Sequence, residues 1–252
     1  MNKGCLKVIG LGPGDECLLA PQARQAIMEA EAVVGYTGYV ELVPQELLEG
    51  REVLSTGMMA EVERCRKAVE AALEGRNVVV VCSGDPGIYA MAGLVMELLE
   101  ADDLFERVDF EVVPGIPAFS AAAALLGAPL MHDFASVSLS DLLTPWEKIE
   151  KRLEAAASAD FVIAIYNPRS KKRAGHLGEA VEILKKYRSE NTPVGIVNRA
   201  YREGQRVQVV TLDSLDVKDV DMQTVIIVGN SSTREVAGKM LTPRGYANKY
   251  DI

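Results

Sequence analysis

Glycines and polar residues gather in short loops that directly follow apolar, strand-like runs. One loop reads Gly10-Leu11-Gly12-Pro13-Gly14-Asp15, and another reads Ser83-Gly84-Asp85-Pro86-Gly87. Ligands of open α/β sheets bind at the carboxyl ends of strands, where glycines let them approach the backbone. The sequence therefore predicts a small-molecule site on these loops. Asp85 would suit a cation or a donor-rich ligand, with Ile88 and Tyr89 as apolar cover.

The first loop also invites comparison with the GxGxxG fingerprint of dinucleotide-binding proteins. The third glycine of that fingerprint falls on Asp15, whose charge repels phosphate, and Pro13 lacks an amide donor. A dinucleotide cofactor is therefore disfavoured. Each loop also has a plain alternative: a tight turn for the first, and for Asp85 a cap of the following helix.

Cations concentrate after two later strands, although the formal net charge of the chain is −9. Tyr166-Asn167-Pro168 leads into Arg169-Ser170-Lys171-Lys172-Arg173, and Arg199, Arg202 and Arg206 follow the next strand. A solvated charge run is the usual explanation. The functional alternative is that both loops converge on a polyanionic ligand, because the planar fork of arginine pairs well with carboxylates.

The histidines and cysteines argue against a bound metal. The chain has two histidines, His132 and His176, and four cysteines without a CxxC spacing. This pattern disfavours zinc, an iron–sulfur cluster and a disulfide framework. We expect His176 on a helix surface. His132, which lies beside Asp133, is a candidate for acid–base chemistry, although a single histidine is more often a local hydrogen-bonding residue.

The elements that must position these residues alternate between short β-branched runs and helical stretches, as in βα units that feed a mainly parallel sheet. With 252 residues, 48% of them apolar, the chain can bury a sizeable core. The predicted strands are Leu6–Gly10, Ala32–Gly35, Asn77–Cys82, Asp109–Val113, Asp160–Tyr166, Val194–Asn198, Val207–Leu212 and Thr224–Gly229. The predicted helices are Pro21–Ala30, Ala60–Glu74, Ile88–Ala101, Ala118–Leu126, Trp146–Ala157 and Gly175–Ser189.

The run Val113-Pro114-Gly115-Ile116-Pro117 predicts a boundary between two lobes, residues 1–116 and 117–252. The short connection around Gly204 predicts that part of the second lobe is antiparallel. The acidic balance argues against nucleic-acid binding. No run reaches the roughly 20 apolar residues of a membrane span, and no leader pattern is visible, so we expect a cytoplasmic protein.

Taken in chain order, Gly10–Asp15, Ser83–Gly87 and Val113–Ile116 resemble the tetrapyrrole methylase family, the class III S-adenosylmethionine methyltransferases. Further segments resemble its branch that methylates C17 of precorrin-3B or cobalt-factor III. The likeness covers essentially the whole chain. These segments are Gly35–Tyr39, His132–Phe134, Ser138–Trp146, Tyr166–Pro168 and Val228–Ser231.

The resemblance implies two α/β lobes with mostly parallel sheets and S-adenosylmethionine bound in the cleft between them, usually in a homodimer. It also implies methylation of C17 coupled to contraction of the tetrapyrrole ring in cobalamin biosynthesis, with S-adenosylhomocysteine as product. Whether the substrate arrives with cobalt or without it stays open.

By the same resemblance, one set of residues touches the methyl donor: Pro13, Gly84, Asp85, Ile88, Pro117, Ala118, Tyr166, Asn167, Arg199, Ala200, Thr224 and Ile226. The substrate contacts are Gly12, Arg169, Lys171 and Arg173. The candidates for moving protons are Tyr36, Thr37, Asp85 and His132. Pro117 replaces a threonine of many relatives, and Tyr36 stands where uroporphyrinogen methylases carry an aspartate. A cysteine-bearing extension is absent, so no cluster is expected.

Other functions stay open at this point. The chain could act on another corrin carbon, on diphthamide or on ribosomal RNA ribose, the last being least compatible with the acidic charge. A dinucleotide-dependent oxidoreductase and a non-catalytic donor-binding protein are the alternatives from other classes.

Overall fold

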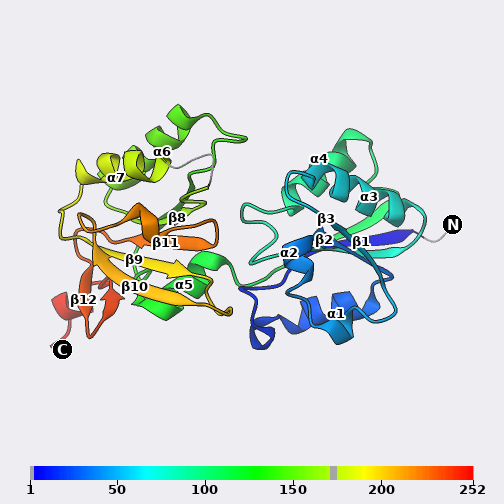
Figure 1. Ribbon diagram of the computed structural model, residues 1–252, viewed down its shortest axis with the longest axis horizontal. Helices are drawn as coiled ribbons and strands as arrows, with labels where there is room; N and C mark the ends of the chain where they lie inside the picture. The colour runs from blue at the N-terminus through cyan, green and yellow to red at the C-terminus, as the bar shows by residue number, and fades with distance from the viewer. Residues whose placement is uncertain (1–2, 171–174, 252) are drawn as a thin grey trace. The chain divides into compact units, whose positions relative to one another are not determined.

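The computed structural model describes residues 3–170 and 175–251 and divides into two compact units, Met1–Ala118 and Phe119–Ile252 (Figure 1). The boundary predicted from the sequence, after residue 116, lies two residues earlier. Each unit has its own five-stranded sheet and its own hydrophobic core, as expected of separate domains.

The sheet of the first unit is parallel throughout, in the order β3-β2-β4-β1-β5. The consecutive valines 78–81 are buried on both faces of this sheet, as is typical of parallel strands covered by helices. Parallel pairing brings the carboxyl ends of all five strands to one edge. The strands are β1 (Gly4–Gly10), β2 (Ala32–Tyr36), β3 (Glu52–Thr56), β4 (Asn77–Cys82) and β5 (Val108–Val113).

Helices cover both faces of this sheet. Val78 and Val80 pack in one cluster with α3 (Glu61–Leu73) and α4 (Ala92–Ala101). Val79 and Val81 point to the other face and pack with α1 (Pro21–Glu29). The two-residue alternation of a strand thus divides one valine run between two cores. A short helix, α2 (Thr37–Val40), follows β2 directly.

The sheet of the second unit is mixed, in the order β10-β9-β11-β8-β7. Only β7 and β8 pair in parallel, and the other three pairs are antiparallel. The antiparallel part predicted from the connection around Gly204 is therefore confirmed. The strands are β7 (Phe134–Ser138), β8 (Val162–Tyr166), β9 (Pro193–Asn198), β10 (Arg206–Thr211) and β11 (Thr224–Val228).

One face of the second sheet packs against α6 (Trp146–Ser158) and α7 (His176–Lys185). On the other face, a Cβ at Gly195 would lie 2.3 Å from Leu126 Cδ1, so the end of α5 (Ala118–Leu126) touches β9 closely. A small sheet flanks this region, formed by β6 (Gly127–Ala128), β12 (Arg234–Val236) and β13 (Lys239–Leu241). Short 3₁₀ helices lie at Glu16–Leu18, Gln45–Leu47, Val217–Asp219 and Tyr246–Asn248.

Five strands, the short helix α2 and one helix start differ from the sequence predictions. Three of these strands, β6, β12 and β13, have only two or three residues each. The strands β3 and β7 were not predicted, because both are partly exposed edge strands without a continuous apolar run. The helix predicted from Ile88 begins instead at Ala92. Tyr89 adopts a left-handed conformation with φ 54°, which a helix does not tolerate. Within residues 3–170 and 175–251, no helix is long and apolar enough to cross a membrane.

Candidate functional site

Two loops at the carboxyl edge of the first sheet are joined by backbone hydrogen bonds. Leu11 N donates to Cys82 O at 2.8 Å, which extends the pairing of β1 and β4 by one residue. Gly12 and Gly84 then exchange two hydrogen bonds, of 3.1 and 2.7 Å. The polar groups of Gly12 are thereby used within the protein. Its predicted contact with substrate could only be a van der Waals contact.

The glycines of these loops are required by close backbone packing. A Cβ at Gly115 would lie 2.1 Å from Gly84 O, and a Cβ at Gly10 would lie 2.5 Å from the same oxygen. Gly12 and Gly84 also adopt φ angles of +68° and +70°. Any side chain at Gly10 or Gly115 would push the loops apart, so the glycine pattern builds this edge of the sheet.

Asp85 joins two of the loops with its carboxylate. Oδ1 accepts from Gly87 N at 2.9 Å, and Oδ2 accepts from Gly115 N at 3.1 Å. The alternative role as a helix cap is wrong, because α4 begins only at Ala92. Ile88 lies in the turn that Asp85 starts, with its amide donating to Asp85 O at 3.3 Å. Asp85 is therefore a fixed carboxylate at the edge where a ligand was expected.

Tyr36 and Thr37 follow β2 at the same edge of the sheet. Thr37 Oγ1 donates to Thr56 O at 3.2 Å, and the Tyr36 ring meets the edge of Tyr39 with centroids 5.2 Å apart. The guanidinium of Arg64 lies 6.0 Å from the Tyr36 ring centroid and donates to Thr56 Oγ1 at 2.5 Å. Arg64 is a site residue that was not predicted from the sequence, although an arginine on the apolar face of a predicted helix was a visible signal.

Arg64 is only 3% exposed, and its Nε has no hydrogen-bond partner. Nη1 also donates to Gly57 O at 3.1 Å, and Nη2 donates to Glu61 Oε1 at 3.1 Å. These contacts fix the strand end opposite Tyr36, since Thr56 and Tyr36 are register partners in β3 and β2.

The thiols near this edge are poor nucleophiles. Burial raises the pKa of the Cys82 thiol to about 12 and that of the Cys65 thiol to about 11. At neutral pH both are protonated, and the thiolate is the reactive form. Cys82 and Cys65 are therefore not candidates for nucleophilic chemistry.

In the second unit, the predicted donor contacts gather at one edge of the mixed sheet. Tyr166 ends β8, and its hydroxyl accepts from Phe119 N in the first turn of α5 at 3.0 Å. Asn167 adopts φ 51° and donates from Nδ2 to Ser138 Oγ at 2.9 Å. Pro117 precedes this helix and Ala118 is its first residue, and both belong to the first unit. Side-chain hydrogen bonds thus fix Tyr166 and Asn167.

Thr224 and Ile226 lie on β11, and the side chain of each already contacts other parts of the protein. Thr224 Oγ1 accepts from Asn198 Nδ2 at 2.6 Å and donates to Asp221 Oδ1 at 2.8 Å, and the residue is buried. Ile226 is fully buried in the core formed with α6 and α7. The hydroxyl of Thr224 is thus bonded within the protein and the side chain of Ile226 faces the core. Their contact with a methyl donor stays a prediction, which these bonds direct to the backbone of β11.

The basic residues are partly tethered. Arg169 Nη1 donates to Val217 O at 2.6 Å, and Arg199 Nε donates to Gln223 Oε1 at 2.7 Å. Arg199 adopts φ 48°, and Ala200 follows it in a turn beyond β9. Lys171 and Arg173, predicted to grip the substrate, lie outside the described residues.

His132 lies at the opposite edge of the second sheet. Phe134 pairs with Val162, and Ser138 pairs with Tyr166, so the four strand steps between these pairs span roughly 13 Å, and His132 lies two residues before Phe134. His132 instead lines a cavity of about 410 Å³ together with Asp160, Asn230 and Arg244. The structure therefore does not bring His132 together with the predicted donor contacts.

His176 was expected on a helix surface, and that expectation is wrong. Its ring stacks on Trp146, with centroids 4.1 Å apart and an interplanar angle of 13°. Its Nδ1 lies 3.3 Å from Leu139 O, and its Nε2 lies 3.8 Å from Asp141 Oδ2. The imidazole is thus a contact point between α7 and the segment that follows β7.

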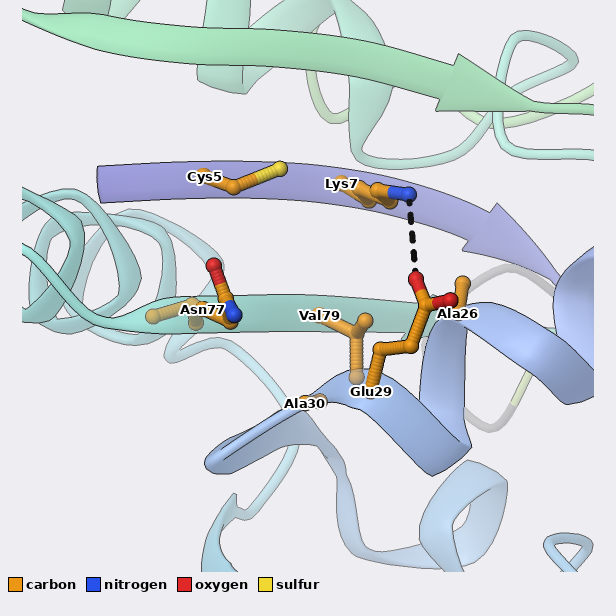
Figure 2. Close-up of a pocket in the computed structure, with 8 residues that line it drawn as sticks. Cys5, Lys7, Ala26, Glu29, Ala30, Asn77 and Val79 are labelled. Carbon is orange, nitrogen blue, oxygen red and sulfur yellow. Dashed lines mark ion pairs between the residues drawn. The ribbon is translucent and has the colours of Figure 1, made fainter. Parts of the chain in front are cut away.

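A small cavity in the first unit lies away from the glycine loops, near the amino ends of β1 and β4. It measures about 90 Å³ and is lined by Cys5, Lys7, Glu29 and Asn77, among others (Figure 2). Lys7 Nζ lies 3.8 Å from Glu29 Oε2, the ion pair drawn as a dashed line. Small-molecule pockets usually measure about 300–1,000 Å³, so this cavity is too small for a nucleoside.

No group of His, Cys, Asp and Glu that could hold a metal ion occurs among residues 3–170 and 175–251. The candidate residues of the first unit are therefore backbone loops and the carboxylate of Asp85, and those of the second unit are fixed polar side chains and two arginines. Such an arrangement can orient an organic ligand and bind carboxylates.

Known proteins show a consistent likeness. A family model described as Tetrapyrrole (Corrin/Porphyrin) Methylases matches residues 6–216. The chain is 50% identical over 252 residues to a cobalt-factor III methyltransferase of Priestia megaterium, covering 99% of this chain but only 46% of that protein. It is also 50% identical to a probable cobalt-factor III C(17)-methyltransferase of Salmonella typhimurium, covering 96% of this chain and 99% of that one. The crystal structure of the methyltransferase CobJ matches with a TM-score of 0.90 and 42% identity, over 95% of this chain and 100% of that one.

Proposed function

The chain belongs to the tetrapyrrole (corrin/porphyrin) methylase family, and we propose that it transfers a methyl group from S-adenosylmethionine to C17 of a precorrin-3B or cobalt-factor III type tetrapyrrole. The transfer would be coupled to ring contraction in cobalamin biosynthesis. The substrate assignment rests chiefly on the 50% identity to the Salmonella relative, which this chain matches over 99% of its length.

The chemistry of the glycine loops fits this donor. The loops 10–15, 83–87 and 113–117 contain no lysine or arginine, and their only charged side chains are Asp15 and Asp85. S-Adenosylmethionine carries a cationic sulfonium and an ammonium group but no phosphate. A cradle of backbone groups beside a fixed carboxylate suits such a cation better than it suits a dinucleotide.

S-Adenosylmethionine supplies an activated methyl group on its sulfonium. The task left to the protein is to hold the donor and the carbon nucleophile in line and away from water. We assign the donor contacts to the interlocked loops of Gly12, Gly84 and Asp85 and to the edge at Tyr166 and Asn167. Hydrogen bonds in the glycine loops and at Tyr166 and Asn167 support this assignment, because they fix the backbone conformation before a ligand binds.

Ring contraction requires proton movement, for which we keep Tyr36, Thr37 and Asp85 as candidates. Arg64 would keep Tyr36 and Thr56 in place. His132 is left out, since it precedes β7 at the end of that strand roughly 13 Å from the end that pairs with Tyr166. Arg169 and Arg199 would bind peripheral carboxylates of the macrocycle.

Methylation of defined substrates tests this function. Purified protein is incubated with methyl-labelled donor and either a cobalt-loaded or a metal-free precursor, and product masses are read. We expect one added methyl group, and the preferred precursor shows whether cobalt is required. Failure to methylate either precursor, despite tight binding of S-adenosylhomocysteine, would reject the proposed function.

Single-turnover assays measure methylation and ring contraction separately. Tyr36→Phe and Asp85→Asn should slow contraction more than methylation if these groups move protons. His132→Ala is the matched control and should behave as the wild type in both steps. A loss of contraction in the control alone would return His132 to the site.

A homodimer and a cytoplasmic location are the remaining parts of the proposal, both taken from the likeness to the family. Light scattering during size-exclusion chromatography and cell fractionation test them. A monomer at micromolar concentration would argue against the dimer.

A further inference from the structure

The segment from Ser140 to Pro145, between β7 and α6, is held at both ends by one imidazole. On the amino-terminal side, His176 Nδ1 lies 3.3 Å from Leu139 O and Nε2 lies 3.8 Å from Asp141 Oδ2. On the carboxyl-terminal side, the ring stacks on Trp146. The two ends of the segment are therefore fixed to α7 through the same side chain.

The base of this segment is rigid. Leu139 is fully buried in the hydrophobic core, and its amide donates to Tyr166 O at 2.9 Å. Trp146 Nε1 donates to Glu179 Oε2 at 2.7 Å, which fixes the indole that His176 stacks on. Because Tyr166 carries the predicted donor edge, the segment starts at the edge where the ligands are proposed to bind.

Between these fixed ends, two adjacent leucines face solvent. Leu142 is 71% exposed and Leu143 is 99% exposed. Because Leu142 and Leu143 are exposed, they contribute little to the free energy of folding of the unit. They can instead contact the apolar surface of a ligand. Arg169 follows Tyr166 by three positions on the neighbouring strand end, so apolar and cationic side chains share this edge.

We propose that Leu142 and Leu143 contact one apolar face of the tetrapyrrole macrocycle, and that His176 is the positioning residue that holds them there. This inference rests on the proposed function. A tetrapyrrole has flat apolar faces and a rim of carboxylates, which matches two leucines beside Arg169. A phosphate-rich or nucleic-acid ligand would find no partner in the leucines.

The double variant Leu142→Ser/Leu143→Ser tests the contact. We expect KM for the tetrapyrrole to rise at least about tenfold, because burying even one leucine is worth roughly that factor. The dissociation constant for S-adenosylhomocysteine and the melting temperature should stay within experimental error, since both leucines are exposed. Val236→Ser, which alters an exposed apolar residue of β12, is the matched control and should leave KM unchanged.

His176→Phe and His176→Asn test the positioning role. Phenylalanine keeps a ring against Trp146 but loses the polar contacts, and asparagine keeps a donor for Leu139 O but loses the stack. We expect both to raise KM about three- to tenfold with little change in kcat. Trp146 is the only tryptophan of the chain, so its emission reports the stack directly and should change most in His176→Asn.

The outcomes are distinguishable. An unchanged KM in the double variant, with an active wild type, overturns this inference and leaves the proposed function standing. A lowered melting temperature, a weaker affinity for S-adenosylhomocysteine or a changed oligomeric state in the double variant would show that the leucines serve the fold, the donor or a second copy of the chain, and also overturns it. A wild type that methylates no tetrapyrrole removes the proposed function and this inference together.

Discussion

Different groups hold the candidate ligand-binding edges of the two units together. In the first unit, backbone groups of Gly12, Gly84 and Gly115 pack directly on one another, and Asp85 is the one side chain shown to tie loop to loop. In the second unit, side chains do this work, as in the pair Thr224–Asn198. A parallel sheet ends all its strands at one edge, where loops crowd, whereas the mixed sheet leaves room for side chains.

This difference teaches where each edge is vulnerable. The edge of the first unit, which is held by close backbone packing, is destabilised when an atom is added, because a Cβ has no space there. The edge of the second unit, which is held by side-chain hydrogen bonds, is destabilised when a polar atom is removed, because its buried partner then lacks a hydrogen bond. Substitutions at the two edges separate these two kinds of failure.

The largest effect is expected for Gly115→Ala. The new Cβ would meet Gly84 O at 2.1 Å, so the loops must separate. We expect the free energy of unfolding to fall by about 3 kcal/mol, and affinity for S-adenosylhomocysteine to fall together with it. Urea denaturation and calorimetry measure both quantities.

Gly93→Ala is the control for that change. A Cβ at Gly93 meets nothing within 4 Å, and the position lies in α4, so alanine should stabilise by about 0.5–1 kcal/mol. If Gly115→Ala matched this control in both measurements, the backbone description of the first edge would be wrong.

The second effect is expected for Thr224→Val, which keeps the shape but removes the hydroxyl. Asn198 Nδ2 and Asp221 then lose a buried partner, and we expect a loss of about 2 kcal/mol in urea denaturation. Affinity for S-adenosylhomocysteine should change less than about twofold, because the hydroxyl is bonded within the protein.

Ser158→Ala, at an exposed hydroxyl, is the matched control and should cost less than about 0.5 kcal/mol. A large loss of donor affinity in Thr224→Val, without a loss of stability, would mean that the threonine serves the ligand instead.

The third effect concerns alkaline pH and the buried thiols of the first unit, which contains all four cysteines. Folded Cys82 and Cys65 ionise only near pH 12 and pH 11, against an ordinary value of 9.0. Above pH 9 the unfolded chain releases protons that the folded unit keeps, so stability falls as pH rises. At pH 10 we expect a loss of about 1.4 kcal/mol per thiol.

Urea denaturation at pH 8 and pH 10 measures this loss, with circular dichroism for the whole chain and the emission of Trp146 for the second unit. Cys65→Ala should remove the share of one buried thiol from the pH dependence, about 1.4 kcal/mol at pH 10. An equal dependence in that variant would contradict the role of burial.

The smallest effect is expected for Arg169→Ala. We expect affinity for the tetrapyrrole to fall about fivefold, roughly 1 kcal/mol, while affinity for S-adenosylhomocysteine stays unchanged. Arg107→Ala, at an exposed arginine of the first unit, is the control. Equal losses for both ligands in calorimetry would remove Arg169 from substrate binding.

The sequence predicted elements well where burial was strong. The valine run of β4 and the alanine-rich helix α5 were placed with the bounds that the structure has. The edge strands β3 and β7 were missed because one exposed side hides the apolar pattern. Of the candidate site, the loops of Gly12 and Gly84 were found from composition, while Arg64 was missed because its burial depends on packing against Thr56.

What the sequence determined by itself was local: which runs form strands, which turns need glycine, and that Asp85 and Arg169 follow strand ends. The tertiary structure decided which of these residues meet. Both oxygens of Asp85 accept hydrogen bonds from backbone amides, and the hydroxyl of Thr224 accepts one from Asn198. His132 lies at the far edge of its sheet from Tyr166. His176 contacts both ends of the segment between β7 and α6. These outcomes depend on strand register and on contacts between residues distant in the chain, which local propensity does not encode.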